Sequence, residues 1–473
     1  MLQGVAFLLL LLIQCHLSDQ DLECLPKTLR SVGLDFMKSF EAFKEKVQSF
    51  FHISFDKIEK RRLKIKNAFY NFLDESFGEL DSDKRNLLAL SEGSREEGMP
   101  APHMITAHGY RVQSYTILTQ DGFLLTLHRV MAGDIEARSR NKIALLHHGL
   151  FGSSDDWLIL GKGRALPYLL SAAGYDVWLA NARGNKYSRA HINRTVDEVG
   201  FWNFSWHEIG LYDLSAVIDY VVGVSSKNTE IHFIGHALGA TSLLVLLSVA
   251  PKYNDILKSA TFLAPLVYMY HVEGPLKILA DSYEYRSTDN IYRPTLLRSE
   301  IFSPKVIERF CRGEVRLCLN PFLLLANGGQ DFANSYITEA VLSHVPAGSS
   351  KKMLIHYLQL IKSGEFQMFD YGYIKNMEKY GESTPSSYDL NQVTVPVIIF
   401  SSSSDWLSTV PDIVNLLTKI HNVIVHHVVK KSDFSHTDFL WSNNAPELVY
   451  YLILDILQQR LEQKKGKESD TGE

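Results

Sequence analysis

Short apolar runs typical of β-strands alternate with stretches of helical periodicity from about residue 100 onward. The apolar runs are 143–148, 176–180, 231–234, 261–265, 395–400 and 423–429. Helical patterns at 164–173, 209–222 and 446–463 lie between or after them. Two further runs, 115–119 and 123–127, flank an Asp-Gly turn and predict a β-hairpin. The alternation predicts an α/β fold with a mainly parallel central sheet and helices on both faces.

Residues 271–390 interrupt this rhythm, because they are helical in pattern and rich in aromatic residues. The sheet pattern resumes at 395–400, so the interruption is an insertion between two strands of one sheet. An insertion of this size predicts a helical cap that covers the functional site of the protein. We therefore expect the core in two parts, 99–270 and 391–463, followed by a disordered polar tail at 464–473.

Residues 1–18 are typical of a secretory signal peptide. Their apolar run, 5–13, has nine residues, which is too short for a bilayer span of about 20. A cleaved signal is the favoured interpretation, and an uncleaved anchor is the alternative. Residues 19–98 follow as a helical extension with a basic face. This extension is interpreted as a pair of amphipathic helices with a solvated basic face, as a pro-segment, or as a helix that lies on a membrane surface.

The composition is that of an ordinary globular protein. Of 473 residues, 46% are hydrophobic and 21% are charged, and the net charge is −5. Nucleic-acid binding would need a basic excess, so we predict no such partner. We also expect no metal and no cofactor. The secretory route makes the sequons at Asn193 and Asn203 usable, and at least one is expected to carry a glycan.

The chain has four cysteines, and one of them, Cys15, lies in the signal peptide. Cys311 and Cys318 are close in sequence and are expected to form a disulfide in an oxidising compartment. Two free thiols are the alternative. Cys24 is then left either free or paired with another chain.

A nucleophile elbow without its nucleophile follows the run 231–234. Residues 235–239 read Gly-His-Ala-Leu-Gly and are followed by an apolar helical stretch. The strand, the pinched turn and the helix match the G-x-S-x-G frame, in which a sharp turn lifts one side chain above the sheet. Ala237 stands where that frame has serine.

An acid and a base follow the elbow in the order of an α/β-hydrolase triad. Asp405 comes after the run 395–400, and His436 comes after the run 423–429. The loop that follows the run 143–148 suits an oxyanion hole. The backbone N–H groups of Leu150 and Leu238 are its expected donors.

Together these features resemble the acid lipase family, which includes gastric and lysosomal acid lipases and insect relatives. The similar stretches are 108–110, 120–123, 127–129, 148–150, 174–179, 181–185, 201–210, 369–372 and 405–407. The resemblance implies an α/β-hydrolase core with a helical cap, a secreted or lysosomal setting and hydrolysis of triacylglycerols or sterol esters. The positions that match the family's triad are Ala237, Asp405 and His436.

The chain departs from the family pattern in three places. Ala237 replaces the serine, Leu238 replaces a polar residue, and residues 401–404, all serine, replace a glycine-containing turn before the acid. We expect that the serine run at 401–404 can shift the position of Asp405. The first change removes the chemistry, because acyl transfer needs an oxygen that attacks the carbonyl and holds the acyl group.

The favoured hypothesis is a secreted, lipase-like protein without lipase activity. It would bind a neutral lipid or acyl ester in an apolar pocket, contact a membrane or lipid droplet, and serve in storage or as a yolk-type protein. One alternative is a lipid ester hydrolase with weak or altered activity. Another is a structural or interaction protein with a vestigial pocket. A lysosomal location is the alternative to secretion.

Overall fold

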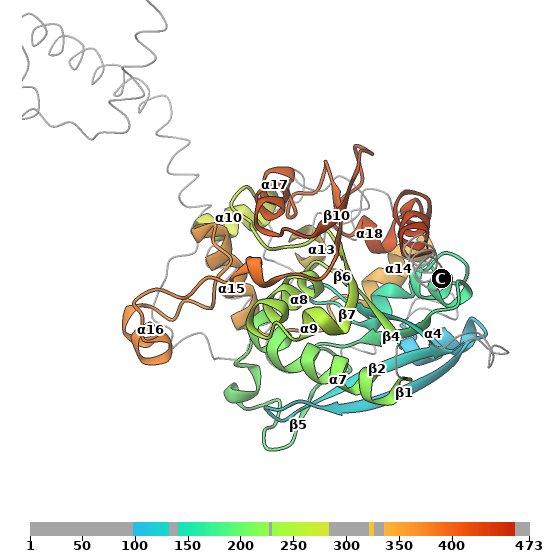
Figure 1. Ribbon diagram of the computed structural model, residues 1–473, viewed down its shortest axis with the longest axis horizontal. Helices are drawn as coiled ribbons and strands as arrows, with labels where there is room; N and C mark the ends of the chain where they lie inside the picture. Colours follow the sequence, from blue (N-terminus) through green and yellow to red (C-terminus); the bar gives the residue numbers. More distant parts are fainter. Residues whose placement is uncertain (1–97, 132–140, 227–228, 283–320, 326–334, 459–473) are drawn as a thin grey trace, which may run out of the picture. The chain divides into compact units, whose positions relative to one another are not determined.

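The structure, a computed structural model, describes residues 98–131, 141–226, 229–282, 321–325 and 335–458. In this part of the chain, nine strands form one sheet in the order β1-β2-β4-β3-β6-β7-β9-β10, with β5 beside β2 (Figure 1). The strands are β1 (Arg111–Leu118), β2 (Phe123–Met131), β3 (Lys142–His147), β4 (Asp176–Ala180), β5 (Ala190–His191), β6 (Glu230–His236), β7 (Leu257–Leu263), β9 (Val397–Ser402) and β10 (Val423–Val429). Every neighbouring pair from β4 to β10 is parallel, which confirms the predicted α/β fold.

The predicted hairpin is also confirmed. Strands β1 and β2 pair antiparallel, from Arg111 opposite Met131 to Leu118 opposite Leu124. Gly122 in the connecting turn has φ +99°, and a Cβ there would lie 2.9 Å from the His191 ring. Both the positive φ and the close approach require glycine at this position.

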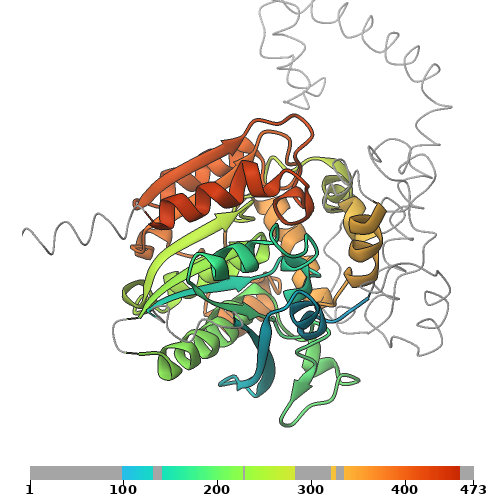
Figure 2. The ribbon, with the colours of Figure 1, turned by 90° about the vertical axis from the view of Figure 1, so that its right-hand side faces the viewer.

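Helices cover both faces of the sheet (Figures 1 and 2). The helices of the core are α4 (Ala101–Ala107), α5 (Leu166–Ala172), α6 (Trp206–Glu208), α7 (Ser215–Val224), α8 (Leu238–Val249), α9 (Tyr253–Ile256), α17 (Val410–Lys419) and α18 (Asp438–Trp441). The crossover through α5 runs toward β1, whereas those through α7, α8 and α17 run toward β10. Because such crossovers are right-handed, α5 and α8 lie on opposite faces. Sequence order reverses around β3, and ligands of open α/β sheets bind at the carboxyl ends of strands beside such a reversal.

Several predicted elements have different bounds in the structure, among them the run 261–265 and the helix at 209–222. The predicted run 261–265 overlaps the second half of a longer strand, β7. This strand begins at Leu257 and ends at Leu263, and the next residue, Ala264, has φ +48°. The first half of β7 was not predicted because it contains polar residues. One of them, Ser259, is buried and hydrogen-bonds Nδ1 of His232 on β6 at 2.8 Å. The helix predicted at 209–222 begins as a π-helical turn, η4 (Ile209–Leu214), and continues as α7.

The described residues of 271–390 are mainly helical. They form α10 (Gly274–Ser282), α13 (Pro321–Leu325), α14 (Ser335–His344), α15 (Lys351–Ser363) and α16 (Tyr373–Tyr380). Side chains from Lys351 to Ile361 are buried on every face of α15, so this helix is packed into the interior. Among the residues that the structure describes, none of the helices has the length and apolar character needed to cross a bilayer. The predicted signal, extension, disulfide and polar tail lie outside the described residues.

Candidate functional site

Ala237 sits at the apex of a sharp turn between β6 and α8. Its backbone has φ +46° and ψ −106°, in a region that non-glycine residues rarely adopt. Such a conformation costs about 1–3 kcal/mol and persists only where its surroundings hold it. Here the N–H of Ala237 donates to the carbonyl of Leu263 at 3.0 Å, and its carbonyl accepts from Thr241 N–H at 3.1 Å. The turn therefore keeps an elbow's geometry with alanine at its apex.

The two glycines of the elbow are required by packing. A Cβ on Gly235 would lie 2.7 Å from the backbone nitrogen of Ala240, and one on Gly239 would lie 2.5 Å from the carbonyl oxygen of His147. Both contacts are closer than real Cβ atoms show. The glycines are thus explained by the close approach of β6, α8 and β3, whatever the site does.

Asp405 and His436 form a buried pair. The Nδ1–H of His436 donates to Asp405 Oδ2 at 2.8 Å, and the backbone N–H groups of Leu407 and Ser408 donate to Oδ1 at 2.8 and 3.0 Å. Burial alone would raise the pKa of Asp405, but the charge and hydrogen bond of His436 and these two N–H groups hold it below its usual value. The serine run 401–404 has therefore not moved the carboxylate away from the histidine.

His436 and Ala237 line the same cavity. The Nε2–H of His236, the neighbour of Ala237, donates to the backbone carbonyl of His436 at 3.0 Å and ties the two loops together. Burial, with the nearby His436, lowers the pKa of His236 to about 3, so its ring is neutral. Within the described residues, Nε2 of His436 makes no hydrogen bond, so this nitrogen is available to an occupant of the cavity.

The loop after β3 packs directly against the elbow. A Cβ on Gly149 would lie 3.6 Å from the Cβ of Ala237 and 2.7 Å from Nδ1 of His236. His148 fixes this loop by donating from Nδ1 to the carbonyl of Gly149 at 2.7 Å. Leu150 lines the cavity, and Leu238 is the first residue of α8, so its N–H has no acceptor within the helix. Leu238 follows Ala237 in the chain and Leu150 follows Gly149 in the adjoining loop, and the role of their N–H groups as oxyanion donors stays a prediction.

The cavity beside Ala237 has a mainly apolar wall. Its apolar side chains are Leu150, Phe151, Leu266, Met269, Leu276, Phe322, Leu323, Leu325, Val345, Leu354, Leu407, Leu440 and Trp441. Several of them, from Leu276 to Leu354, come from the insertion 271–390. Polar groups sit at few points of the wall: Asp156, His236, Tyr357, His436 and Thr437. An apolar cavity with few polar groups is typical of a site for a hydrocarbon chain with one polar end.

Asp156 is a polar residue of this wall that was not predicted from the sequence. It is buried, its Oδ2 accepts from the N–H of Ser153 at 3.2 Å, and its Oδ1 has no hydrogen-bond partner. Burial, reinforced by the charge of Asp155, raises the pKa of Asp156 to about 8. The neighbouring Asp155 differs from Asp156, because its carboxylate is ion-paired with Lys186 and His344. In the sequence, the only sign that Asp156 is unusual is that a second acidic residue, Asp155, stands next to it.

The raised pKa of Asp156 predicts a stability that falls as pH rises. From about pH 4 to about pH 8 the unfolded chain has lost this proton while the folded protein keeps it. The free energy of unfolding should therefore decrease by up to ~1.4 kcal/mol per pH unit in that window. The Asp156→Asn variant should lack this component and be more stable than the natural chain at pH 7. Urea unfolding at several pH values measures it, and an unchanged slope in the variant would contradict the assignment.

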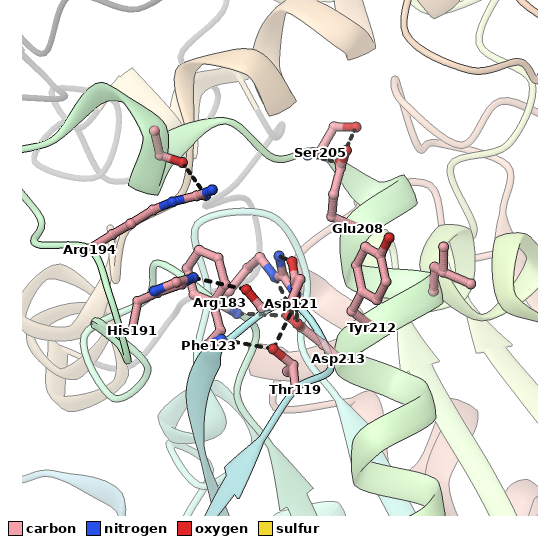
Figure 3. Close-up of polar contacts among 12 residues, drawn as sticks. Thr119, Asp121, Phe123, Arg183, His191, Arg194, Ser205, Glu208, Tyr212 and Asp213 are labelled. Carbon is pink, nitrogen blue, oxygen red and sulfur yellow. Dashed lines mark hydrogen bonds and ion pairs between the residues drawn. The ribbon is translucent and has the colours of Figure 1, made fainter. Parts of the chain in front are cut away.

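A second charge cluster, centred on the buried Arg183, lies outside the cavity (Figure 3). Arg183 donates from Nε to Asp213 Oδ1 at 2.7 Å and from a terminal nitrogen to Asp121 Oδ1 at 2.8 Å. Its guanidinium also lies 4.1 Å from the centre of the Phe123 ring. The cluster joins the hairpin turn, the loop after β4 and the turn η4. The described residues contain no group of three side chains able to hold a metal ion.

Comparison with known proteins places the chain in a family. Residues 101–161 match the partial α/β-hydrolase lipase region, and residues 144–300 match the α/β-hydrolase fold. The chain is 35% identical over 377 residues to Lipase 1 of Drosophila melanogaster. The aligned region covers 80% of this chain and 84% of Lipase 1. The chain belongs to the acid lipase family. Within that family it is 31% identical to the gastric triacylglycerol lipases of Rattus norvegicus and Homo sapiens, over 78% of this chain and 94% of each of theirs.

The structure of this acid lipase family member brings the predicted site residues together. Ala237, Asp405 and His436 meet at the carboxyl ends of β6, β9 and β10, although they lie far apart in the sequence. The predicted glycan sites Asn193 and Asn203 are both exposed. Their occupancy and the chemical roles of the three cavity residues stay predictions.

Proposed function

We propose that this protein binds a neutral lipid or acyl ester in the apolar cavity and does not hydrolyse it at lipase rates. The observation that carries the proposal is Ala237 at the apex of the elbow. In this architecture the apex side chain is the nucleophile, whose oxygen must form the acyl intermediate. A methyl group cannot attack a carbonyl, so the remaining acid and base have no nucleophile to activate.

The size of the expected loss follows from the chemistry. Removing the serine of a comparable triad costs about a million-fold in turnover, which corresponds to about 8 kcal/mol of activation free energy. Thr241, one turn along α8, does not replace it, because its hydroxyl donates to the carbonyl of Leu266 at 2.6 Å. The cavity wall does not depend on the missing oxygen, so binding is retained.

The intact pair of Asp405 and His436 favours one alternative, a slow hydrolase. His436 could activate a water molecule for direct attack, without a covalent intermediate. The oxyanion donors and the cavity would then support a residual acceleration of about 10³–10⁴-fold over water. A vestigial cavity in a protein that only binds other proteins is the remaining alternative.

The biological setting belongs to the same proposal. We infer a secreted protein with a storage or yolk-type role, and a lysosomal location is the alternative. The exposed sequons support passage through the secretory route. Lipid transfer from a membrane or droplet is supported by α16, on which Tyr373 and Ile374 are 70% and 71% exposed.

The test combines lipid analysis with an ester assay on the secreted protein. Organic extraction and mass spectrometry should recover acyl lipids from the natural chain. A variant with the cavity filled by a larger side chain, Leu354→Trp, should carry less lipid while showing native circular dichroism. Ester hydrolysis at rates typical of lipases would contradict the proposal. Equal lipid content in both proteins would favour the vestigial cavity.

A further inference from the structure

We propose that the preferred ligand is a free long-chain fatty acid, whose carboxyl group takes the place of the missing serine hydroxyl. This inference rests on the proposed lipid-binding function and names its ligand class. The acyl chain would occupy the apolar cavity. One carboxyl oxygen would face the N–H groups of Leu150 and Leu238, and the other would face Nε2 of His436.

His436 offers one ring nitrogen to a ligand. Its Nδ1 is fixed by Asp405 at 2.8 Å, and its backbone carbonyl is held by His236 at 3.0 Å. The ring is therefore oriented and buried, while Nε2 has no partner among the described residues. Nε2 faces the cavity, so a bound hydrocarbon chain would shield it from water, and a polar atom that is shielded without a hydrogen-bond partner costs free energy. A ligand that pairs with Nε2 is favoured over one that does not.

Position 237 leaves space for an oxygen atom of the ligand. Alanine lacks one oxygen atom relative to serine, and its methyl group lines the cavity beside His436. A serine hydroxyl would fill that space and donate to Nε2 itself. With alanine, the same place is open to an oxygen atom of the ligand. A carboxyl group supplies two oxygens in one plane, which suits an oxyanion hole on one side and Nε2 on the other.

Acids and esters differ in the hydrogen bond that they can make with Nε2 of His436. The alkoxy oxygen of an ester carries carbon and has no proton, so it cannot donate to Nε2. A carboxylic acid can donate to the neutral ring, or its carboxylate can accept from the protonated ring. Both descriptions place one proton between oxygen and nitrogen. The acid therefore makes one more hydrogen bond than the ester of the same chain.

The charges that face this point are consistent with an acid bound together with its proton. Asp405 is negative and lies on the far side of the His436 ring. Burial keeps His236 neutral, with a pKa of about 3, and the raised pKa of Asp156, about 8, keeps that carboxyl uncharged at neutral pH. Tyr357, on α15, is buried and its pKa is raised by burial. No fixed cation lines the cavity within the described residues, so a bare carboxylate would bind poorly.

The experiment compares ligands of one chain length. Delipidated protein is titrated with oleic acid, methyl oleate and oleyl alcohol, by calorimetry or by displacement of a fluorescent probe. Oleic acid should bind at least about tenfold more tightly than methyl oleate, as expected for one additional hydrogen bond. The Ala237→Ser variant should bind oleic acid about tenfold more weakly, because its hydroxyl takes both the space and the nitrogen.

Ala237→Gly is the matched control, since it changes the same position without adding an oxygen. It should keep the preference for oleic acid over methyl oleate. Equal affinities of the natural chain for the acid and the methyl ester would overturn the inference and leave lipid binding intact. The inference also fails if the serine and glycine variants bind oleic acid equally well. If none of the three lipids binds, the proposed function itself is wrong.

Discussion

Replacing Ala237 by serine should give this protein an ester hydrolase activity at least ~10³-fold above that of the natural chain. The other parts of the machinery are in position. The turn holds residue 237 in an elbow conformation, His436 is oriented by Asp405, and the loop at Gly149 packs against the elbow. A serine oxygen at this apex would lie beside a histidine nitrogen that has no other partner in the described residues. The measurement is kcat/KM for p-nitrophenyl esters of short and long acyl chains.

The control for this experiment is a second substitution. Adding His436→Ala to the serine variant should abolish the gain, because the new hydroxyl would have no base. Ala237→Gly should remain as inactive as the natural chain. A serine variant that folds with an unchanged Tm yet hydrolyses no ester would show that the buried pair no longer supports catalysis. The cavity would then have lost more than its nucleophile.

Replacing Arg183 by methionine should destabilise the protein by about 3–5 kcal/mol, because it leaves the buried carboxylate of Asp213 without its cation. The side chain of Arg183 is 1% exposed, and those of its partners Asp213 and Asp121 are 2% and 29% exposed. Methionine keeps much of the apolar volume over Phe123 but none of the donors. Urea unfolding of the purified protein measures the loss.

Arg129→Met is the matched control for the buried cluster. Arg129 also binds one carboxylate through two hydrogen bonds, both of 2.7 Å to Asp176, but the two side chains are 20% and 12% exposed. Water can solvate this carboxylate once its partner is removed, so the loss should be about 1 kcal/mol. Equal losses in the two variants would show that burial does not set the cost at Arg183.

Much of the fold followed from patterns that are local in the chain. The strand predicted at 423–429 has the same bounds in the structure, and the hairpin at residues 111–131 forms around Gly122. Strand β7 was placed too late, because the buried Ser259 has the polarity of a surface residue. Its hydroxyl is satisfied by His232 on the next strand, and a partner of that kind cannot be read from the surrounding sequence.

Part of the site was also predictable. The elbow is a continuous segment, so its glycines and its alanine are visible in the sequence. Asp405 and His436 were predicted from their order after strands, and the structure pairs them across 31 positions of sequence. Asp156 was missed, because nothing in its local sequence says that the carboxyl group is buried beside the cavity with one oxygen unpaired.

The sequence by itself determined the periodicity of the elements, the elbow and the absence of a hydroxyl at residue 237. These properties depend on residue identity and on short-range backbone preferences. Only the tertiary structure decided that His436 is oriented by Asp405, that the insertion contributes to the cavity wall and that Asp156 keeps its proton near neutral pH. Those properties arise from strand order and burial, which bring distant residues together and remove water from them.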